Sequence, residues 1–137
     1  MNTLRGRIVS IESNDHVSLV DVEVSGDIFT ATLLETPEDA AYLQVGNAVD
    51  VLFKETEVSL AKGLSGLISL RNRVITTVKQ VRSGVILSEV VLDYRGQPLS
   101  SIITTRSIRR LDIKAGDEVE ALVKANEMTL MEVVDGL

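Results

Sequence analysis

The chain contains one sequence pattern twice. Residues 2–62 align with residues 72–132 without a gap, at a constant offset of 70 positions. The match is clearest between residues 46–54 (GNAVDVLFK) and residues 116–124 (GDEVEALVK). Identity between the copies is low, but the spacing of the apolar residues persists. An internal repeat constrains architecture before any single residue does, so we expect one structural unit built twice.

Each copy reads as five short strands with one small helix. Alternating β-branched residues separated by Gly-containing turns predict the strands, and Thr36-Pro37 is typical of a helix start in the first copy. The predicted fold is all-β: two tandem five-stranded, OB-like barrels, each with one short helix, as modules 1–66 and 67–137. The expected strands are 4–11, 17–24, 28–34, 48–54 and 58–61, then 74–81, 85–94, 99–104, 119–124 and 128–133, with helices starting at 36 and 105.

Size and charge indicate that the two copies pack together. A domain of about 65 residues buries only roughly 60% of its unfolded surface, which is marginal for independent stability. Residues 1–68 hold four Lys/Arg against eleven acids, a net of −7, while residues 69–137 hold ten against nine acids, a net of +1. We therefore expect attraction between unlike modules, within the chain or between copies of it.

Composition and motifs disfavour several classes of function. The chain has no Cys, and its single histidine, His16, lies at a predicted turn without a catalytic partner. No phosphate-loop or dinucleotide pattern is present, so we expect a protein that is not an enzyme. An acidic chain with few aromatic residues is a poor candidate for nucleic-acid binding. No leader or membrane-spanning segment is expected, which predicts a soluble, cytoplasmic protein.

Hydrogen-bond donors gather at three places in the second copy. These are Ser69 to Arg71 before its first strand, Thr104 to Ser107 at its helix start, and Lys124-Ala125-Asn126 after its fourth strand. Hydroxyls, fixed positive charge and free backbone N–H groups suit a tetrahedral oxyanion. Ordinary capping and turn formation is the alternative reading of the hydroxyls. In the first copy Leu34 and Pro37 replace Thr104 and Ser107, and only the lysine is kept, as Lys54.

The second copy contains the strings Ser69-Leu-Arg-Asn72, Gly84 with Glu89-Val90, Thr104-x-x-Ser107 and Lys124-Ala125-Asn126. These strings resemble the molybdate-binding Mop (molbindin, TOBE) family. The typical family strings read Ser-Ala-Arg-Asn, Gly-Ala-Val-Asn-Ala-Glu-Val, Thr-x-x-Ser and Lys-Ala-Ser. This chain departs from them at Leu70, Leu87 and Asn126.

The resemblance implies an intracellular protein that binds molybdate or tungstate for storage, buffering or sensing. It implies sites between modules of a homo-oligomer, preferably a trimer, with a dimer possible. When the family's anion-binding positions are transferred to this chain, the resemblance implies that Ser69, Leu70 and Arg71 contact the anion from one module. Thr104, Ser107, Lys124, Ala125 and Asn126 contact it from the facing module, and Lys54 is a weaker candidate. No cofactor and no direct metal-cation ligand is implied.

A second reading stays open from the sequence alone. In that reading the Mop fold serves only as an oligomerisation scaffold of a regulatory or interaction module. The incomplete donor set of the first copy favours it. The sequence does not choose between molybdate and tungstate, because both are dianions of nearly equal size.

Overall fold

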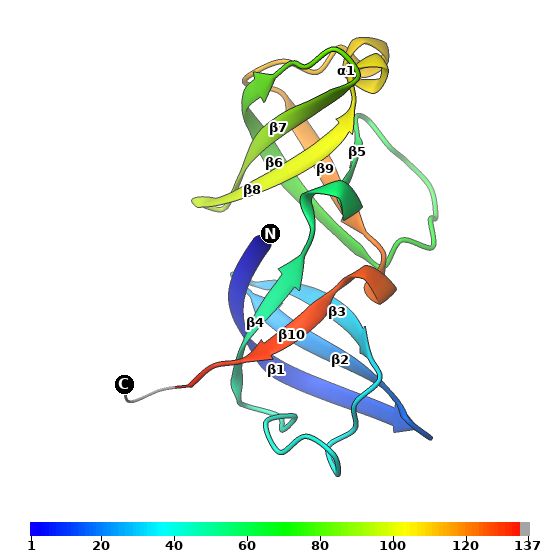
Figure 1. Ribbon diagram of the computed structural model, residues 1–137, viewed down its shortest axis with the longest axis vertical. Helices are drawn as coiled ribbons and strands as arrows, with labels where there is room; N and C mark the ends of the chain where they lie inside the picture. The colour runs from blue at the N-terminus through cyan, green and yellow to red at the C-terminus, as the bar shows by residue number, and fades with distance from the viewer. Residues whose placement is uncertain (135–137) are drawn as a thin grey trace.

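Two β-modules are stacked along the long axis of the molecule. The computed structural model describes residues 1–134 of the chain. Figure 1 shows the first module below and the second above, with the N-terminus between them. Each module contains a five-stranded antiparallel sheet that is strongly curved and not fully closed. The predicted all-β class and the paired five-stranded units are confirmed.

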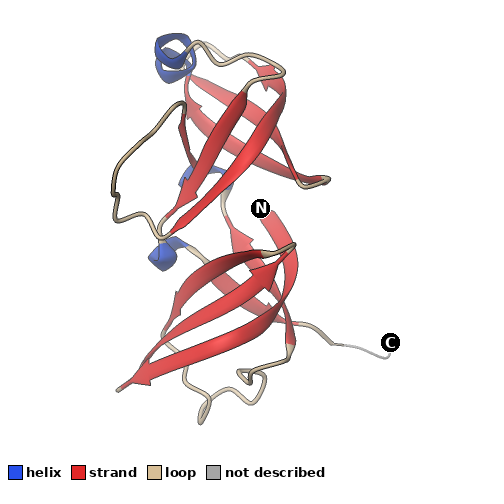
Figure 2. Ribbon diagram, turned by 180° about the vertical axis from the view of Figure 1, so that it is seen from behind, coloured by secondary structure: helices blue, strands red, loops and turns tan. Residues whose placement is uncertain are grey.

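The lower sheet has the order β10-β4-β1-β2-β3, and the upper sheet has the order β5-β9-β6-β7-β8. Figure 2 shows the two sheets from behind, with the long loop between β5 and β6 on one side of the upper module. The strands run over Asn2–Asn14 (β1), Val17–Val24 (β2), Asp27–Leu33 (β3), Ala48–Phe53 (β4), Ser59–Ala61 (β5), Asn72–Arg82 (β6), Leu87–Tyr94 (β7), Gln97–Thr104 (β8), Glu118–Val123 (β9) and Thr129–Glu132 (β10).

The repeated sequence produces repeated local geometry. The hairpins β2–β3 and β7–β8 both turn through two residues with positive φ, Ser25-Gly26 and Arg95-Gly96, as expected of tight turns whose twist matches the strands. The pairing of β1 with β2 shifts register between Ile8 and Ser10, and that of β6 with β7 shifts between Val78 and Gln80. An irregularity of this kind bends a strand, so both long first strands curve at equivalent points.

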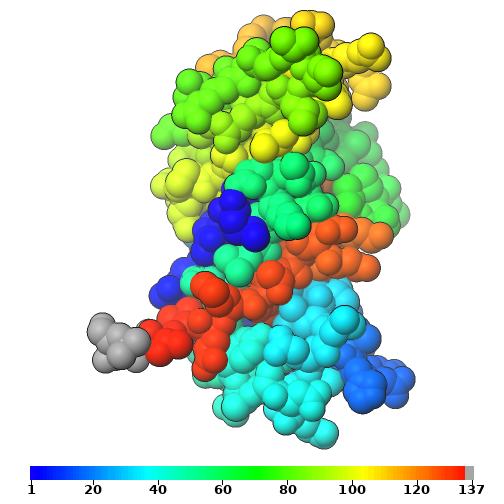
Figure 3. Space-filling view, in the orientation of Figure 1, coloured from blue at the N-terminus to red at the C-terminus, as the bar shows by residue number. Residues whose placement is uncertain are grey.

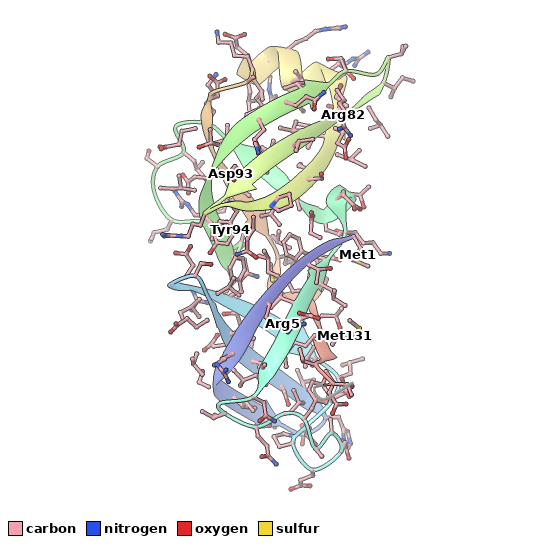
Figure 4. The ribbon with its side chains drawn as sticks, turned by 90° about the vertical axis from the view of Figure 1, so that its left-hand side faces the viewer. Met1, Arg5, Arg82, Asp93, Tyr94 and Met131 are labelled. Atoms are coloured by element: carbon pink, nitrogen blue, oxygen red, sulfur yellow. The ribbon has the colours of Figure 1, made fainter. Side chains whose placement is uncertain are left out.

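The last strand of each repeat leaves its own module. We expected residues 58–61 and 128–133 to close their own barrels, and this expectation is wrong. β5 pairs with β9 of the second copy, and β10 pairs with β4 of the first. Figure 3 shows the orange-red C-terminal segment lying against the lower module, and Figure 4 places Met131 in that module with Arg5. The predicted division at residue 66 describes the sequence repeats, whereas each sheet combines strands from both.

The helix expected to begin at Thr36 does not form. The amides of Asp39 and Ala40 both donate to the Thr36 carbonyl, at 3.0 and 2.9 Å, which gives a single turn. The Thr36 hydroxyl donates to the Asp39 carboxylate at 3.1 Å instead of accepting a backbone N–H. Ala40 and Leu43 are buried, so packing holds this segment as successive turns. The second copy keeps its helix, α1 (Thr105–Leu111), capped by the Thr104 hydroxyl.

One apolar core runs through both modules. It consists mainly of Val, Ile and Leu side chains from the inner faces of the two sheets. Phe29 and Tyr94 meet edge to face across the module boundary, with ring centroids 5.8 Å apart. The Tyr94 hydroxyl donates to the Val24 carbonyl at 3.0 Å and to the Asp27 carboxylate at 2.6 Å. The fully buried Tyr94 therefore ties the β7–β8 hairpin to the lower module, as its position in Figure 4 shows.

Candidate functional site

A hollow of about 620 Å³ lies between the modules, on the face of the lower sheet. It forms where the short 3₁₀ turn η2 (Ala125–Glu127) of the second repeat contacts β3 of the first. We call it the inter-module pocket. It is lined by Ser10, Ile11, Glu12, Leu19, Asp21, Thr30, Thr32, Arg71, Ala125 and Asn126.

Three of the predicted site residues meet in this pocket. Arg71 precedes β6, while Ala125 and Asn126 belong to η2. Ser69 and Leu70 stand next to Arg71 in the chain, and Lys124 precedes η2. The side chains of Arg71 and Lys124 are exposed and make no hydrogen bond or ion pair with residues 1–134. The first N–H groups of a helical turn also lack intrahelical acceptors. The second-copy side of the pocket thus carries one available cation, Arg71, and backbone donors, whereas Ser69, Leu70 and Lys124 are neighbours in the chain that do not line the pocket.

Asn72 anchors Arg71 against the lower module. Its side-chain amide donates to the Thr30 carbonyl at 2.9 Å, and its oxygen accepts the Thr30 N–H at 2.6 Å. The equivalent Asn2 does the same with Ser100, at 2.9 and 2.8 Å. Both asparagines are buried, and an unmade bond to a buried backbone group is costly. These paired contacts explain why both copies begin with asparagine.

The floor of the pocket comes entirely from the first copy. Two cross-strand rows on one face of β1, β2 and β3 form it: Ser10–Asp21–Thr30 and Glu12–Leu19–Thr32. The sequence interpretation missed these residues. Polar side chains at alternate strand positions could have indicated an exposed face, since side chains two apart share a face. Only the exchange of strands places the second copy's turn over that face.

Thr104 and Ser107 lie elsewhere in the chain. They are at the start of α1, at the far end of the upper module in Figure 1. The Thr104 hydroxyl accepts the Ser107 N–H at 3.1 Å and donates to the Ser107 hydroxyl at 2.9 Å, so the pair caps the helix. Thr104 also lines a second hollow, of about 450 Å³, with Val85, Ile86, Arg106 and Arg109. Within one chain, Thr104 and Ser107 do not join the inter-module pocket.

The first copy's equivalent turn has different surroundings. η1 (Glu55–Glu57) contacts β8, as η2 contacts β3. Glu55 replaces Ala125 and forms an ion pair with the N-terminal ammonium, which lowers the pKa of the Glu55 carboxyl. Lys54 borders a small hollow of about 100 Å³ that Glu57 and Glu127 also line. The lysine shared by the two copies therefore lies among carboxylates in the first copy.

Two further properties describe residues 1–134. This part of the chain contains no group of three or more His, Asp or Glu side chains placed to hold a metal ion. None of its helices has the length and apolar character required to cross a membrane.

The model of the TOBE domain family matches the chain twice, over residues 1–60 and 68–130. The chain also resembles the molybdenum import ATP-binding protein ModC of Brucella abortus, with 31% identity over 113 residues. That match covers 82% of this chain but 30% of the relative, so the chain spans less than a third of the ModC length.

One further protein resembles a single module of the chain, and another resembles the whole chain. Molybdenum-pterin-binding protein 1 of Clostridium pasteurianum is 35% identical over 65 residues, which is 47% of this chain and 96% of that protein. The crystal structure of the cytoplasmic molybdate-binding protein ModG, with molybdate bound, superposes with a TM-score of 0.90 at 27% identity, covering 96% of each chain. The whole two-module arrangement is thus shared with ModG.

Proposed function

Because this chain belongs to the TOBE domain family, we propose that it binds molybdate or tungstate at the inter-module pocket. The observation that carries this proposal is the convergence of Arg71 with Ala125 and Asn126, two segments far apart in the sequence, on one pocket. The relative that matches both modules over 96% of its length is a molybdate-binding protein. We propose a cytoplasmic binding protein that stores, buffers or senses the oxyanion and catalyses no reaction.

Positive charge and directional hydrogen bonds come from different residues of the proposed site. A dianion leaving water needs compensating positive charge, which Arg71 and Lys124 supply without breaking an ion pair to any residue from 1 to 134. Ser69 and the backbone N–H groups of Ala125 and Asn126 supply directional hydrogen bonds, each worth about 1.5–3 kcal/mol to a charged acceptor. Leu70 takes part through its backbone. This division predicts that truncating either cation weakens binding more than truncating the hydroxyl.

An oligomer would bring the remaining predicted donors to an anion. Thr104 and Ser107 lie at the exposed end of the upper module, beside Val85 and Ile86, which are 93% and 75% exposed. Apolar side chains this exposed mark a surface that a partner covers. We propose a homo-oligomer, preferably a trimer, in which this end of one chain's second module faces the inter-module pocket of a neighbouring chain. Sedimentation showing only monomer at micromolar concentration would contradict this assembly.

The test is calorimetric titration of the purified protein with molybdate, tungstate and sulfate. Arg71→Ala and Lys124→Ala should each weaken molybdate binding at least tenfold, because a loss of about 1.4 kcal/mol is one decade. Lys54→Ala is the matched control and should have a smaller effect, since Glu57 and Glu127 line the same hollow as that lysine. Equal losses from Lys54→Ala and Lys124→Ala would show that both copies build sites.

The exposed end of the upper module, where Val85 and Ile86 lie, also supports an alternative function. The Val85 and Ile86 surface and the carboxylates around Lys54 suit an interaction module that binds no anion. Absence of binding by the unmutated protein, together with oligomerisation that Ile86→Asp abolishes, would favour this alternative.

A further inference from the structure

Asp21 is held at the centre of the inter-module pocket's floor. It lies on β2 between Ser10 on β1 and Thr30 on β3, its neighbours in the two ladders. The Ser10 hydroxyl donates to one carboxylate oxygen at 2.6 Å, and the Thr30 hydroxyl donates to the other at 2.6 Å. A carboxylate has about four lone-pair positions, so each oxygen can accept one further hydrogen bond. The two hydroxyls therefore fix Asp21 as an acceptor that a ligand can reach.

This acceptor is unexpected in a pocket that takes anions. Asp21 and Glu12 face Arg71 across the same hollow, so its lining has two carboxylates and one guanidinium. In the upper sheet the row equivalent to Ser10–Asp21–Thr30 is Gln80–Val91–Ser100, with a valine at the central position. The fold therefore does not require a carboxylate there.

A fixed carboxylate distinguishes oxyanions by their protonation. A fully ionised tetrahedral dianion, such as molybdate or sulfate at neutral pH, has only acceptor oxygens and is repelled by Asp21. A protonated oxyanion, such as hydrogen phosphate, can donate its O–H to Asp21 while its other oxygens accept from Arg71 and Asn126. Such a ligand converts the unfavourable contact into a charge-assisted hydrogen bond.

We propose that Asp21 is a specificity-determining residue of the inter-module pocket, which raises the affinity for protonated tetrahedral oxyanions relative to that for fully ionised ones. The proposal rests on the proposed function, because it concerns the same Arg71-dependent site. It adds that Asp21 lowers the affinity for molybdate and raises the relative affinity for hydrogen phosphate. Arg71 attracts both ligands, and Asp21 determines their ratio.

The experiment measures molybdate and inorganic phosphate binding by calorimetry at neutral pH, on the full chain and on variants. Asp21→Asn should lower the ratio of phosphate affinity to molybdate affinity at least tenfold, mainly by tightening molybdate. Asp21→Val, which copies Val91, is the second variant and should change the ratio in the same direction. Thermal unfolding verifies that each variant folds.

Glu12→Gln is the matched control. It removes a charge from the same pocket at an exposed position without disturbing the Ser10–Asp21–Thr30 row, so it should strengthen both ligands alike and leave the ratio unchanged. If molybdate binding depends on Arg71 but neither Asp21 variant changes the ratio, the specificity proposal is overturned and the proposed function stands. If no variant and no unmutated protein binds either anion, both are overturned.

Discussion

Each repeat ends in a short 3₁₀ turn that contacts the sheet of the other module. The two contacts have the same backbone geometry but different side chains. η2 lies on β3 and η1 lies on β8, and the residues preceding them, Lys124 and Lys54, have closely similar backbone angles. At the first contact Arg71, Ala125 and Asn126 leave an open pocket. At the second, Glu55 binds the N-terminal ammonium.

This difference separates what the fold needs from what a ligand needs. The paired hydrogen bonds of Asn72 with Thr30 and of Asn2 with Ser100 occur at both contacts, so the fold itself requires them. Arg71, the short Ala125 side chain and Asp21 occur at only one contact. A duplicated scaffold has thus kept its packing twice while only one pocket kept the residues that suit an oxyanion.

The largest expected effect concerns the architecture. Asn72→Ala removes two hydrogen bonds and leaves the buried N–H and C=O of Thr30 without partners, which should cost about 2–4 kcal/mol of unfolding free energy. Asn2→Ala should cost less, because its partner Ser100 is only partly buried. Chemical denaturation of both variants measures the difference. Similarly small losses of unfolding free energy in both variants would show that these asparagine hydrogen bonds do not hold the modules together.

A smaller effect concerns the pocket itself. Ala125→Glu gives η2 the carboxylate that η1 carries, in a backbone conformation that already accommodates Glu55. A third carboxylate in the pocket that Arg71 lines should weaken molybdate binding at least tenfold, about 1.4 kcal/mol. Calorimetry measures this, with Glu55→Ala as the control that leaves affinity unchanged. Unaltered binding by Ala125→Glu would place the anion site elsewhere.

The smallest expected effect is a pH dependence of stability, which the contact between Asp27 and Arg95 should have and the equivalent contact between Gln97 and Ser25 should lack. Hydrogen bonds from Tyr94 first, and then from Arg95, lower the pKa of Asp27 below its usual range. Asp27 therefore stabilises the fold above its ordinary pKa of about 3.9, and this contribution is lost as the pH falls through the lowered folded value. The gain is less than about 1 kcal/mol, because the ion pair with Arg95 is largely exposed.

Acid unfolding of Asp27→Asn checks this prediction. The variant should be less stable than the unmutated protein at neutral pH, and the difference should shrink as the pH falls through the lowered pKa of Asp27. Gln97 and Ser25, which form the equivalent neutral hydrogen bond at 3.2 Å, provide the comparison, since Gln97→Ala should have no such pH dependence. A constant difference at all pH values would contradict an ionic contribution from Asp27.

The sequence by itself determined the repeat, the strand positions and the second-copy donors. The predicted strand at 17–24 and the helix at 105–111 match the bounds of β2 and α1, because alternation and capping are local signals. The helix expected at Thr36 failed because two local interactions competed. Its hydroxyl binds the Asp39 side chain, while burial of Ala40 and Leu43 favours turns.

Only the tertiary structure decided how the two copies are combined. The exchange of β5 and β10 has no local signal, because a strand's sequence does not specify which sheet edge it joins. That exchange carries Ala125 and Asn126 onto the first copy's sheet and makes Asp21 part of a pocket with Arg71. Asp21 and Arg71 are 50 positions apart in the chain, and their proximity follows from long-range pairing rather than from any local pattern.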